Sequence, residues 1–228
     1  MRWTKLWRDT QAEAGRGLLM LAAIAFALFA VTAMLGAYGI VTREVSRNYM
    51  STNPAHAALD LAAVTPEALA IAKAFPGIAD AEGRSVIEAR AEVDGQWMRM
   101  LVFVVDDFAT LRMNLFRPVS GAWPPPDGTM LIERMAAGVL HAGEGDTVTI
   151  RTPAGRTAKV PVTGIVHDTT LAPAWQEQTG YGYLSLATWA ALGEPAVLEE
   201  LRIMLPGTPT QPEIDAKALE LAAALEAQ

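Results

Sequence analysis

Gly17–Val41, read as GLLMLAAIAFALFAVTAMLGAYGIV, decides the fold of this chain, because its 25 residues carry no charge. At about 1.5 Å per helical residue the stretch reaches roughly 37 Å, enough to cross a hydrocarbon core of about 30 Å with some tilt. A cleavable signal peptide has an apolar region of only about 7–15 residues with a small-residue site just after it. Here the first A-x-A pattern is Ala55-His56-Ala57, well beyond the stretch. A buried helix of a soluble protein would show a polar face, which is missing here, so the sequence predicts a transmembrane helix over 17–41.

Charge is distributed unevenly around this stretch. Residues 1–16 carry a net charge of +2, whereas the whole chain of 228 residues carries −7, which leaves −9 for the part after residue 16. Because basic residues are retained in the cytoplasm, the N-terminus is expected there and residues beyond about 42 outside it. An acidic chain also argues against a protein that coats nucleic acid.

Small residues inside the predicted span indicate packing against other helices. Ala33 and Ala37 are four residues apart, and Gly36 lies on the same helix face. This spacing lets helix backbones approach closely in lipid, and glycine is otherwise costly in a helix. We therefore expect Ala33, Gly36 and Ala37 to contact other spans; the alternative is an alanine-rich helix that contacts only lipid.

The segment before the span has an amphipathic pattern. Trp3, Leu6 and Trp7 are spaced at i, i+3 and i+4, and the charged residues between them fall largely on other faces. Such a pattern is typical of a short helix that lies in the membrane interface. The alternative is an ordinary basic flank that contains tryptophans by chance.

The remainder of the chain predicts an α+β domain. The helix is expected to continue as a stalk until Asn53-Pro54 stops it, and Thr65-Pro66-Glu67 is a helix start. Asp94-Gly95 is a hairpin signal between two long strands. Strands are expected over 58–64, 78–93, 96–105, 129–132, 147–151, 157–166, 180–184 and 201–205, and helices over 66–75, 133–141, 187–192 and 213–228.

This order of elements predicts the fold class: one N-terminal transmembrane helix followed by an extracytoplasmic domain with a split βαβ (ferredoxin-like) unit and a β-rich insertion. The chain reaches Gln228 where a fourth strand of that unit would begin, so we expect part of a longer gene product. The predicted organisation is a cytoplasmic amphipathic segment, a transmembrane helix, a stalk and a periplasmic-type domain. Their ranges are 1–16, 17–41, 42–54 and 55–228.

Sequence patterns of catalytic sites are missing. There is no P-loop, no G-x-S-x-G elbow and no H-E-x-x-H helix, and the absence of cysteine excludes a disulfide framework, a thiolate zinc site and a cysteine nucleophile. His56, His141 and His167 lack metal-ligand spacing. Asp106-Asp107 and His167-Asp168 are better explained as polar strand ends, because neighbouring strand residues point to opposite faces. We expect no enzymatic activity and no cofactor.

Several stretches together resemble the FtsX-like permease family of ABC transporters, and specifically its MacB-type periplasmic core domain. They are Lys5-Leu6-Trp7-Arg8-Asp9, Tyr38-Gly39-Ile40-Val41-Thr42-Arg43-Glu44, Gly121-Ala122-Trp123-Pro124, Met130-Leu131-Ile132-Glu133, Gly145-Asp146-Thr147-Val148 and Val162-Thr163-Gly164-Ile165-Val166-His167-Asp168. The resemblance covers nearly the whole chain but only the N-terminal portion of such a permease, which has three further spans.

The resemblance implies a permease subunit in the inner (plasma) membrane that couples cytoplasmic ATP hydrolysis to an extracytoplasmic conformational change, for export or lipoprotein handling. It implies an ABC ATPase partner, supplied in trans or by a longer gene, and other permease spans or a second permease copy. Trp3, Leu6 and Trp7 would then lie near the ATPase-facing membrane surface. The alternatives from other classes are a single-span anchored interaction or sensor domain and, less well supported, an anchored hydrolase.

Overall fold

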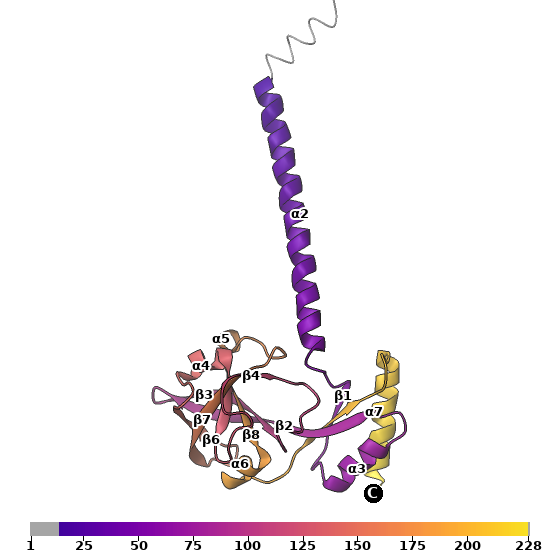
Figure 1. Cartoon of the computed structure of the whole chain (residues 1–228), viewed down its shortest axis with the longest axis vertical. Helices are drawn as coiled ribbons and strands as arrows, with labels where there is room; N and C mark the ends of the chain where they lie inside the picture. Colours follow the sequence, from indigo (N-terminus) through magenta and orange to yellow (C-terminus); the bar gives the residue numbers. More distant parts are fainter. Residues whose placement is uncertain (1–13, 228) are drawn as a thin grey trace, which may run out of the picture. The chain divides into compact units, whose positions relative to one another are not determined.

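The computed structural model describes residues 14–227 (Figure 1). The chain forms two compact units that divide between Asn48 and Tyr49. The first unit contains most of helix α2 (Ala14–Met50), and the second is an α+β domain. Trp3, Leu6 and Trp7, the predicted interfacial residues, lie outside the part of the chain that is described.

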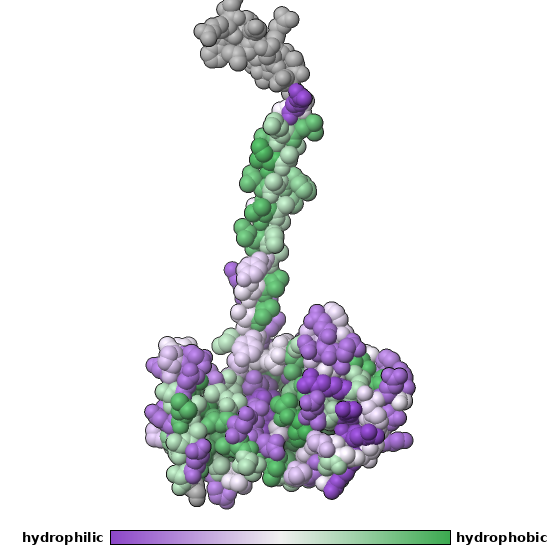
Figure 2. All heavy atoms as spheres, turned by 180° about the vertical axis from the view of Figure 1, so that it is seen from behind, coloured by the Kyte–Doolittle hydropathy of each residue, from purple (hydrophilic) through white to green (hydrophobic). Residues whose placement is uncertain are grey.

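Helix α2 has the properties of a membrane span. Over Gly15–Met50 it is long and apolar enough to cross a bilayer, and apolar residues follow one another along its surface (Figure 2). The hydroxyls of Thr32 and Thr42 each donate to the carbonyl four residues earlier, at 2.8 Å. These bonds satisfy polar groups that have no water to bind in lipid.

The second unit contains nine strands and five helices among the described residues. In chain order they are β1 (Ala57–Asp60), α3 (Pro66–Ala74), β2 (Asp80–Val93), β3 (Gln96–Val105), β4 (Arg117–Gly121), β5 (Met130–Glu133), α4 (Arg134–Leu140), β6 (Thr147–Arg151), β7 (Thr157–His167), α5 (Ala174–Glu177), β8 (Gly180–Ser185), α6 (Leu186–Ala191), β9 (Glu200–Met204) and α7 (Gln211–Glu226).

One part of this domain, here called the small half, consists of β1, β9, the first residues of β2, α3 and α7. Strand β9 lies between β1 and β2 and is antiparallel to both, so β1 and β2 run in the same direction. This is the strand arrangement of a split βαβ unit. Helices α3 and α7 cover one face of the sheet, around a separate apolar core that includes Ala72, Leu201, Ile203 and Leu221.

The other part, the barrel half, closes on itself. Because β6 pairs with both β2 and β7, the strands β2, β3, β8, β5, β7 and β6 form a ring. Its interior is tightly filled: a Cβ on Gly182 would lie 2.4 Å from Met100 Cε and 2.5 Å from Met130 Cε. The β-rich insertion predicted from the sequence is therefore part of a closed barrel.

Strand β2 belongs to both halves. Asp80–Arg84 pairs with β9, and Arg84–Val93 pairs with β3. Its 14 residues make it the longest strand of the domain.

The structure corrects the sequence-based elements in three places. Strand β4 was not expected from the sequence. Its Pro118 cannot donate to a ladder, but β4 lies at the sheet edge, where proline is tolerated, and a bulge follows Pro118. Helix α5 is only four residues long, too short for a periodic pattern. The strand expected over 58–64 ends at Asp60, and the backbone then bonds to residues 198 and 199.

Candidate functional site

The sheet of the small half has one apolar face and one charged face. Side chains alternate along β2 and β9, so Ala81, Leu201 and Ile203 face the helices. The register places Glu82 opposite Arg202 and Arg84 opposite Glu200 on the other face. This charged face is covered by residues 106–116, the loop that follows β3, which we call the strap loop.

Arg84 is the centre of this charged face. Its side chain is only 2% exposed, and its guanidinium lies 3.5 Å from the Met113 carbonyl and 3.9 Å from Glu82 Oε1. Burial, followed by the positive charge of Arg202, lowers the pKa of Arg84 to about 10, although Glu82 acts to raise it. At neutral pH the residue is therefore a buried cation, which is tolerated only while its counter-charge stays close.

Two carboxylates fasten the strap loop to β2. Glu82 Oε2 accepts from the backbone N–H groups of Arg112 at 2.8 Å and Met113 at 3.3 Å. The Arg112 guanidinium donates to both carboxylate oxygens of Asp80, at 2.5 and 3.0 Å. Burial acts to raise the pKa of Asp80, but the hydrogen bonds and charge of Arg112 and the Ala81 N–H outweigh it, so the pKa is lowered.

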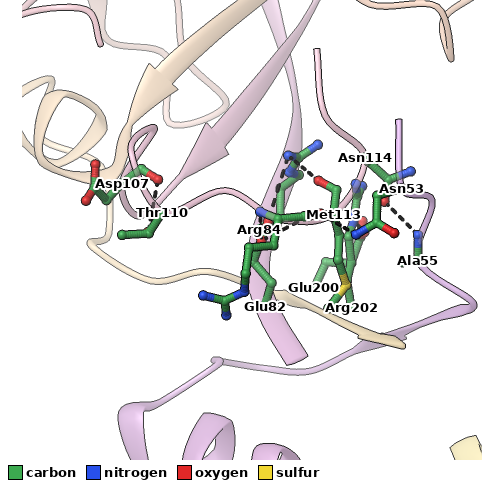
Figure 3. A network of polar contacts seen from close by, with 11 residues as sticks. Asn53, Ala55, Glu82, Arg84, Asp107, Thr110, Met113, Asn114, Glu200 and Arg202 are labelled. Carbon is green, nitrogen blue, oxygen red and sulfur yellow. Dashed lines mark hydrogen bonds and ion pairs between the residues drawn. The ribbon is translucent and has the colours of Figure 1, made fainter. Parts of the chain in front are cut away.

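The residues that follow α2 are fastened to the same loop (Figure 3). We call residues 51–55 the entry segment. Asn53 Nδ2 donates to the Arg112 carbonyl at 2.6 Å, and its own carbonyl accepts from Asn114 N at 3.0 Å. Asn114 Oδ1 accepts from Ala55 N at 3.2 Å, and Leu115 N donates to the Thr52 carbonyl at 2.6 Å.

Both asparagines adopt a backbone conformation that favours this residue type. Asn53 has φ 51° and Asn114 has φ 46°, in the left-handed region that asparagine tolerates better than most residues. A continuous set of hydrogen bonds thus connects the entry segment to the strap loop and the strap loop to β2.

A cleft of about 580 Å³, lined in part by Leu69, Lys73 and Val197, borders the strap loop on another side.

The structure places the sequence-predicted residues elsewhere. Ala33, Gly36 and Ala37 lie exposed on α2, and a Cβ on Gly36 would meet no atom within 4 Å among the described residues. Their packing role stays a prediction, because residues 14–227 contain no second span against which it could be tested.

The two polar pairs considered from the sequence form no joint site. His167 Nδ1 lies 3.2 Å from Glu133 Oε1, whereas Asp168 accepts from the buried Tyr183 hydroxyl at 3.0 Å and from Thr170. Asp107 accepts from Ala109 N at 2.8 Å and thereby shapes the start of the strap loop. Over residues 14–227, no group of three or more His, Asp or Glu side chains could hold a metal ion.

Sequence reasoning missed the roles of Asn53, Glu82, Arg84 and Asn114. One signal was available, because charged residues at 80, 82 and 84 alternate with small residues and so must share one face of a strand. The partner of that face could not be read from the sequence, since the strap loop has no periodic pattern.

Residues 18–219 match the family described as MacB-like periplasmic core domain. This match covers most of the chain. The chain belongs to the MacB-like periplasmic core domain family. A search of curated proteins finds no match.

Two solved structures align with this MacB-like domain. The extracellular domain of the noncanonic ABC-type transporter YknZ from Gram-positive bacteria aligns with a TM-score of 0.50 at 10% identity, over 74% of this chain and 90% of that one. The periplasmic region of MacB from Actinobacillus actinomycetemcomitans aligns with a TM-score of 0.48 at 10% identity, over 75% and 77%. At such identity the YknZ alignment shows a shared fold and nothing further.

Proposed function

We propose that this MacB-like chain is the N-terminal portion of an ABC transporter permease subunit of the FtsX/MacB type. In this proposal a cytoplasmic ATPase hydrolyses ATP, and the resulting movement of the spans changes the conformation of the extracytoplasmic domain for export or lipoprotein handling. The chain itself catalyses no reaction. The family match and the apolar helix α2 support this assignment.

The observation that carries the proposal is the fastening of the entry segment to the strap loop. Movement of the chain after α2 reaches Arg112 and Asn114 through Asn53 and Ala55. The strap loop in turn is bonded to Glu82 on β2, the strand that both halves share. A displacement applied at Thr52 can therefore change the orientation of the small half relative to the barrel half without breaking either apolar core.

In this proposal the N-terminus lies in the cytoplasm and the domain lies outside the inner membrane. The chain has no cysteine, so single cysteines report on topology without background. We expect Asp94→Cys, at the exposed β2–β3 turn, to react with a membrane-impermeant maleimide in intact spheroplasts. Lys5→Cys should react only after lysis. The opposite pattern would overturn the proposed orientation.

Partner binding is tested by co-expressing the complete permease gene product with the ATPase encoded beside it. We expect the two proteins to co-purify in detergent, and Gly36→Leu to reduce co-purification by displacing a neighbouring span. Ala27→Leu adds similar bulk on another side of the helix and serves as the matched control. Full recovery of a membrane protein that neither binds nor stimulates any ATPase would favour a membrane-anchored interaction or sensor domain without transport activity instead.

A further inference from the structure

One end of the barrel half carries both the entry segment and two short helices. Strand β7 is parallel to β5 and antiparallel to β4, and β5 is antiparallel to β8. Hence β5 and β7 end where β4 and β8 begin. Helix α4 follows β5 and helix α5 precedes β8, so both lie at this end, where they pack together (Figure 1).

The entry segment lies at the same end. Arg117, the first residue of β4, is paired with His167, the last residue of β7. Its guanidinium donates to Ser51 Oγ at 3.3 Å. The point where the chain enters the domain after α2 is therefore next to the starts of β4 and α4.

Exposed apolar and basic side chains lie together at this end. Trp175 on α5 is 60% exposed, Val119 on β4 is 54% exposed and Met135 on α4 is 38% exposed. Arg117 and Arg134, each within two residues of one of these apolar side chains, are also exposed. We call these five residues the basic–aromatic face.

Few acidic groups oppose the two arginines. Glu133 and Asp168 are buried. Glu133 already accepts a hydrogen bond from the start of α4, and Asp168 accepts one from Tyr183. Arg134 lies 3.3 Å from His167 Nε2. Among the residues just described, Glu177 on α5 is the exposed carboxylate. The face thus combines an excess of positive charge with an exposed indole.

We propose that the basic–aromatic face binds the headgroups of anionic lipids in the membrane that α2 crosses. The proposal rests on insertion of α2 in a bilayer but is independent of ATPase coupling. Ser51 follows the predicted span by ten residues, so a helical connection of about 1.5 Å per residue keeps it within about 15 Å of the hydrocarbon core. The headgroup layer itself extends several ångströms from the core.

The chemistry of the face matches this occupant. Tryptophan is enriched where a protein meets the headgroup layer, because its ring is apolar and its N–H is polar. Each arginine near an anionic membrane surface strengthens binding by about fivefold at moderate salt. The opposite end of the barrel provides a control position within the same domain. Helix α6 follows β8 and therefore lies at that end, and its residue Ala187 is exposed.

The test uses the full chain in proteoliposomes. Gln176→Cys, an exposed position on α5 that leaves Trp175 in place, and Ala187→Cys are labelled separately with NBD, and vesicles of phosphatidylcholine, with or without phosphatidylglycerol, contain a headgroup spin-labelled lipid as quencher. We expect strong quenching at position 176 and little at 187, and an increase at 176 when phosphatidylglycerol is present. Adding Arg117→Gln and Arg134→Gln should lower the ratio of docked to undocked domain by about fivefold per arginine.

A third label separates this proposal from the one on which it rests. Ala30→Cys, in the middle of the span, should be quenched by a nitroxide on the lipid acyl chain. Quenching at 30 with equal and weak quenching at 176 and 187 would overturn lipid binding while leaving membrane insertion intact. Protection of position 176 from iodide in native membranes, without quenching in vesicles, would also overturn it and point to a protein partner.

Discussion

The barrel half and the small half bury their sheets in different ways. In the barrel half six strands close into a ring around an apolar interior, so each strand of the ring has hydrogen-bonded neighbours on both sides. In the small half only one face of the sheet packs on helices, and the other face holds charged residues under the strap loop. The part of the domain that is tied to the entry segment is therefore held by polar contacts as much as by apolar burial.

This difference indicates where the domain can change shape. Apolar packing in a closed ring tolerates little rearrangement, because every side chain already fills its space. The partly exposed contacts of the strap loop, such as Arg112 with Asp80, can exchange for water at modest cost, whereas the buried pair of Arg84 and Glu82 must stay together. We therefore expect movement between the halves to occur at the strap loop, with the barrel remaining rigid.

Replacement of Arg84 should have the largest effect on the free energy of unfolding, and it should affect the small half more than the barrel half. Arg84→Ala removes the buried cation beside the largely buried Glu82, and breaking such a pair costs about 3–5 kcal/mol of the free energy of unfolding. Urea unfolding of the detergent-solubilised chain, together with hydrogen exchange, should show the small half opening first. The matched control is Arg99→Ala, which breaks an exposed pair with Glu88 and should cost less than about 1 kcal/mol. Equal costs for the two variants would contradict the assigned role of Arg84.

A substitution in the barrel interior should lower the free energy of unfolding and destabilise several strands at once. Ile132 is fully buried, so Ile132→Ala is expected to lower the free energy of unfolding by about 2–5 kcal/mol. Because the ring closes, hydrogen exchange should accelerate in β3, β5, β7 and β8 together, with the amides of the small half less affected. Exchange confined to β5 would show that the ring does not unfold as one unit.

Loosening the entry segment should have an intermediate effect. Asn114→Ala removes the acceptor of Ala55 N and places alanine at φ 46°, for a combined cost of about 2 kcal/mol. Asn114→Gly keeps the backbone conformation and isolates the lost hydrogen bond, so it should cost less. In the complete transporter, a permease with either change that still couples fully to its ATPase would remove the entry segment from the proposed pathway.

The smallest effect on stability is expected from lowering the pH, through Asp80. The pKa of Asp80 is lowered in the folded state, so its contribution to stability is present above the unfolded-state value of about 3.9 and is lost as the pH falls through the folded-state value. The urea midpoint of Asp80→Asn should therefore lie below that of the wild type at neutral pH. The two midpoints should converge in acid, and a difference that persists there would show that Asp80 acts by shape and not by charge.

Much of the fold follows from local patterns in the sequence. Asp94-Gly95 sets the long hairpin of β2 and β3, Thr65-Pro66 starts α3, and the uncharged stretch 17–41 lies within α2. Thr65 caps its helix through Ala68 N, as its position before a proline predicts. These features depend on residues close together in the chain, so they can be read without knowing the tertiary structure.

The candidate site could not be read in this way. Its contacts join residues far apart in the chain, such as Asn53 with Arg112 and Arg84 with Met113. The closure of the barrel likewise depends on β6 pairing with β2, a contact between strands separated by several elements. Neither the strap loop nor this pairing leaves a periodic pattern in the sequence.

Strand β2 restricts how any force can act on the domain. Its register is fixed on one side by β9 and on the other by β3, and a slip of one residue would turn every side chain to the wrong surface in both halves at once. Sliding along the strand axis is thereby prevented, whereas bending near Arg84, where the two ladders meet, preserves both registers. A relative movement of the small half and the barrel half would therefore take the form of a tilt about this point of β2.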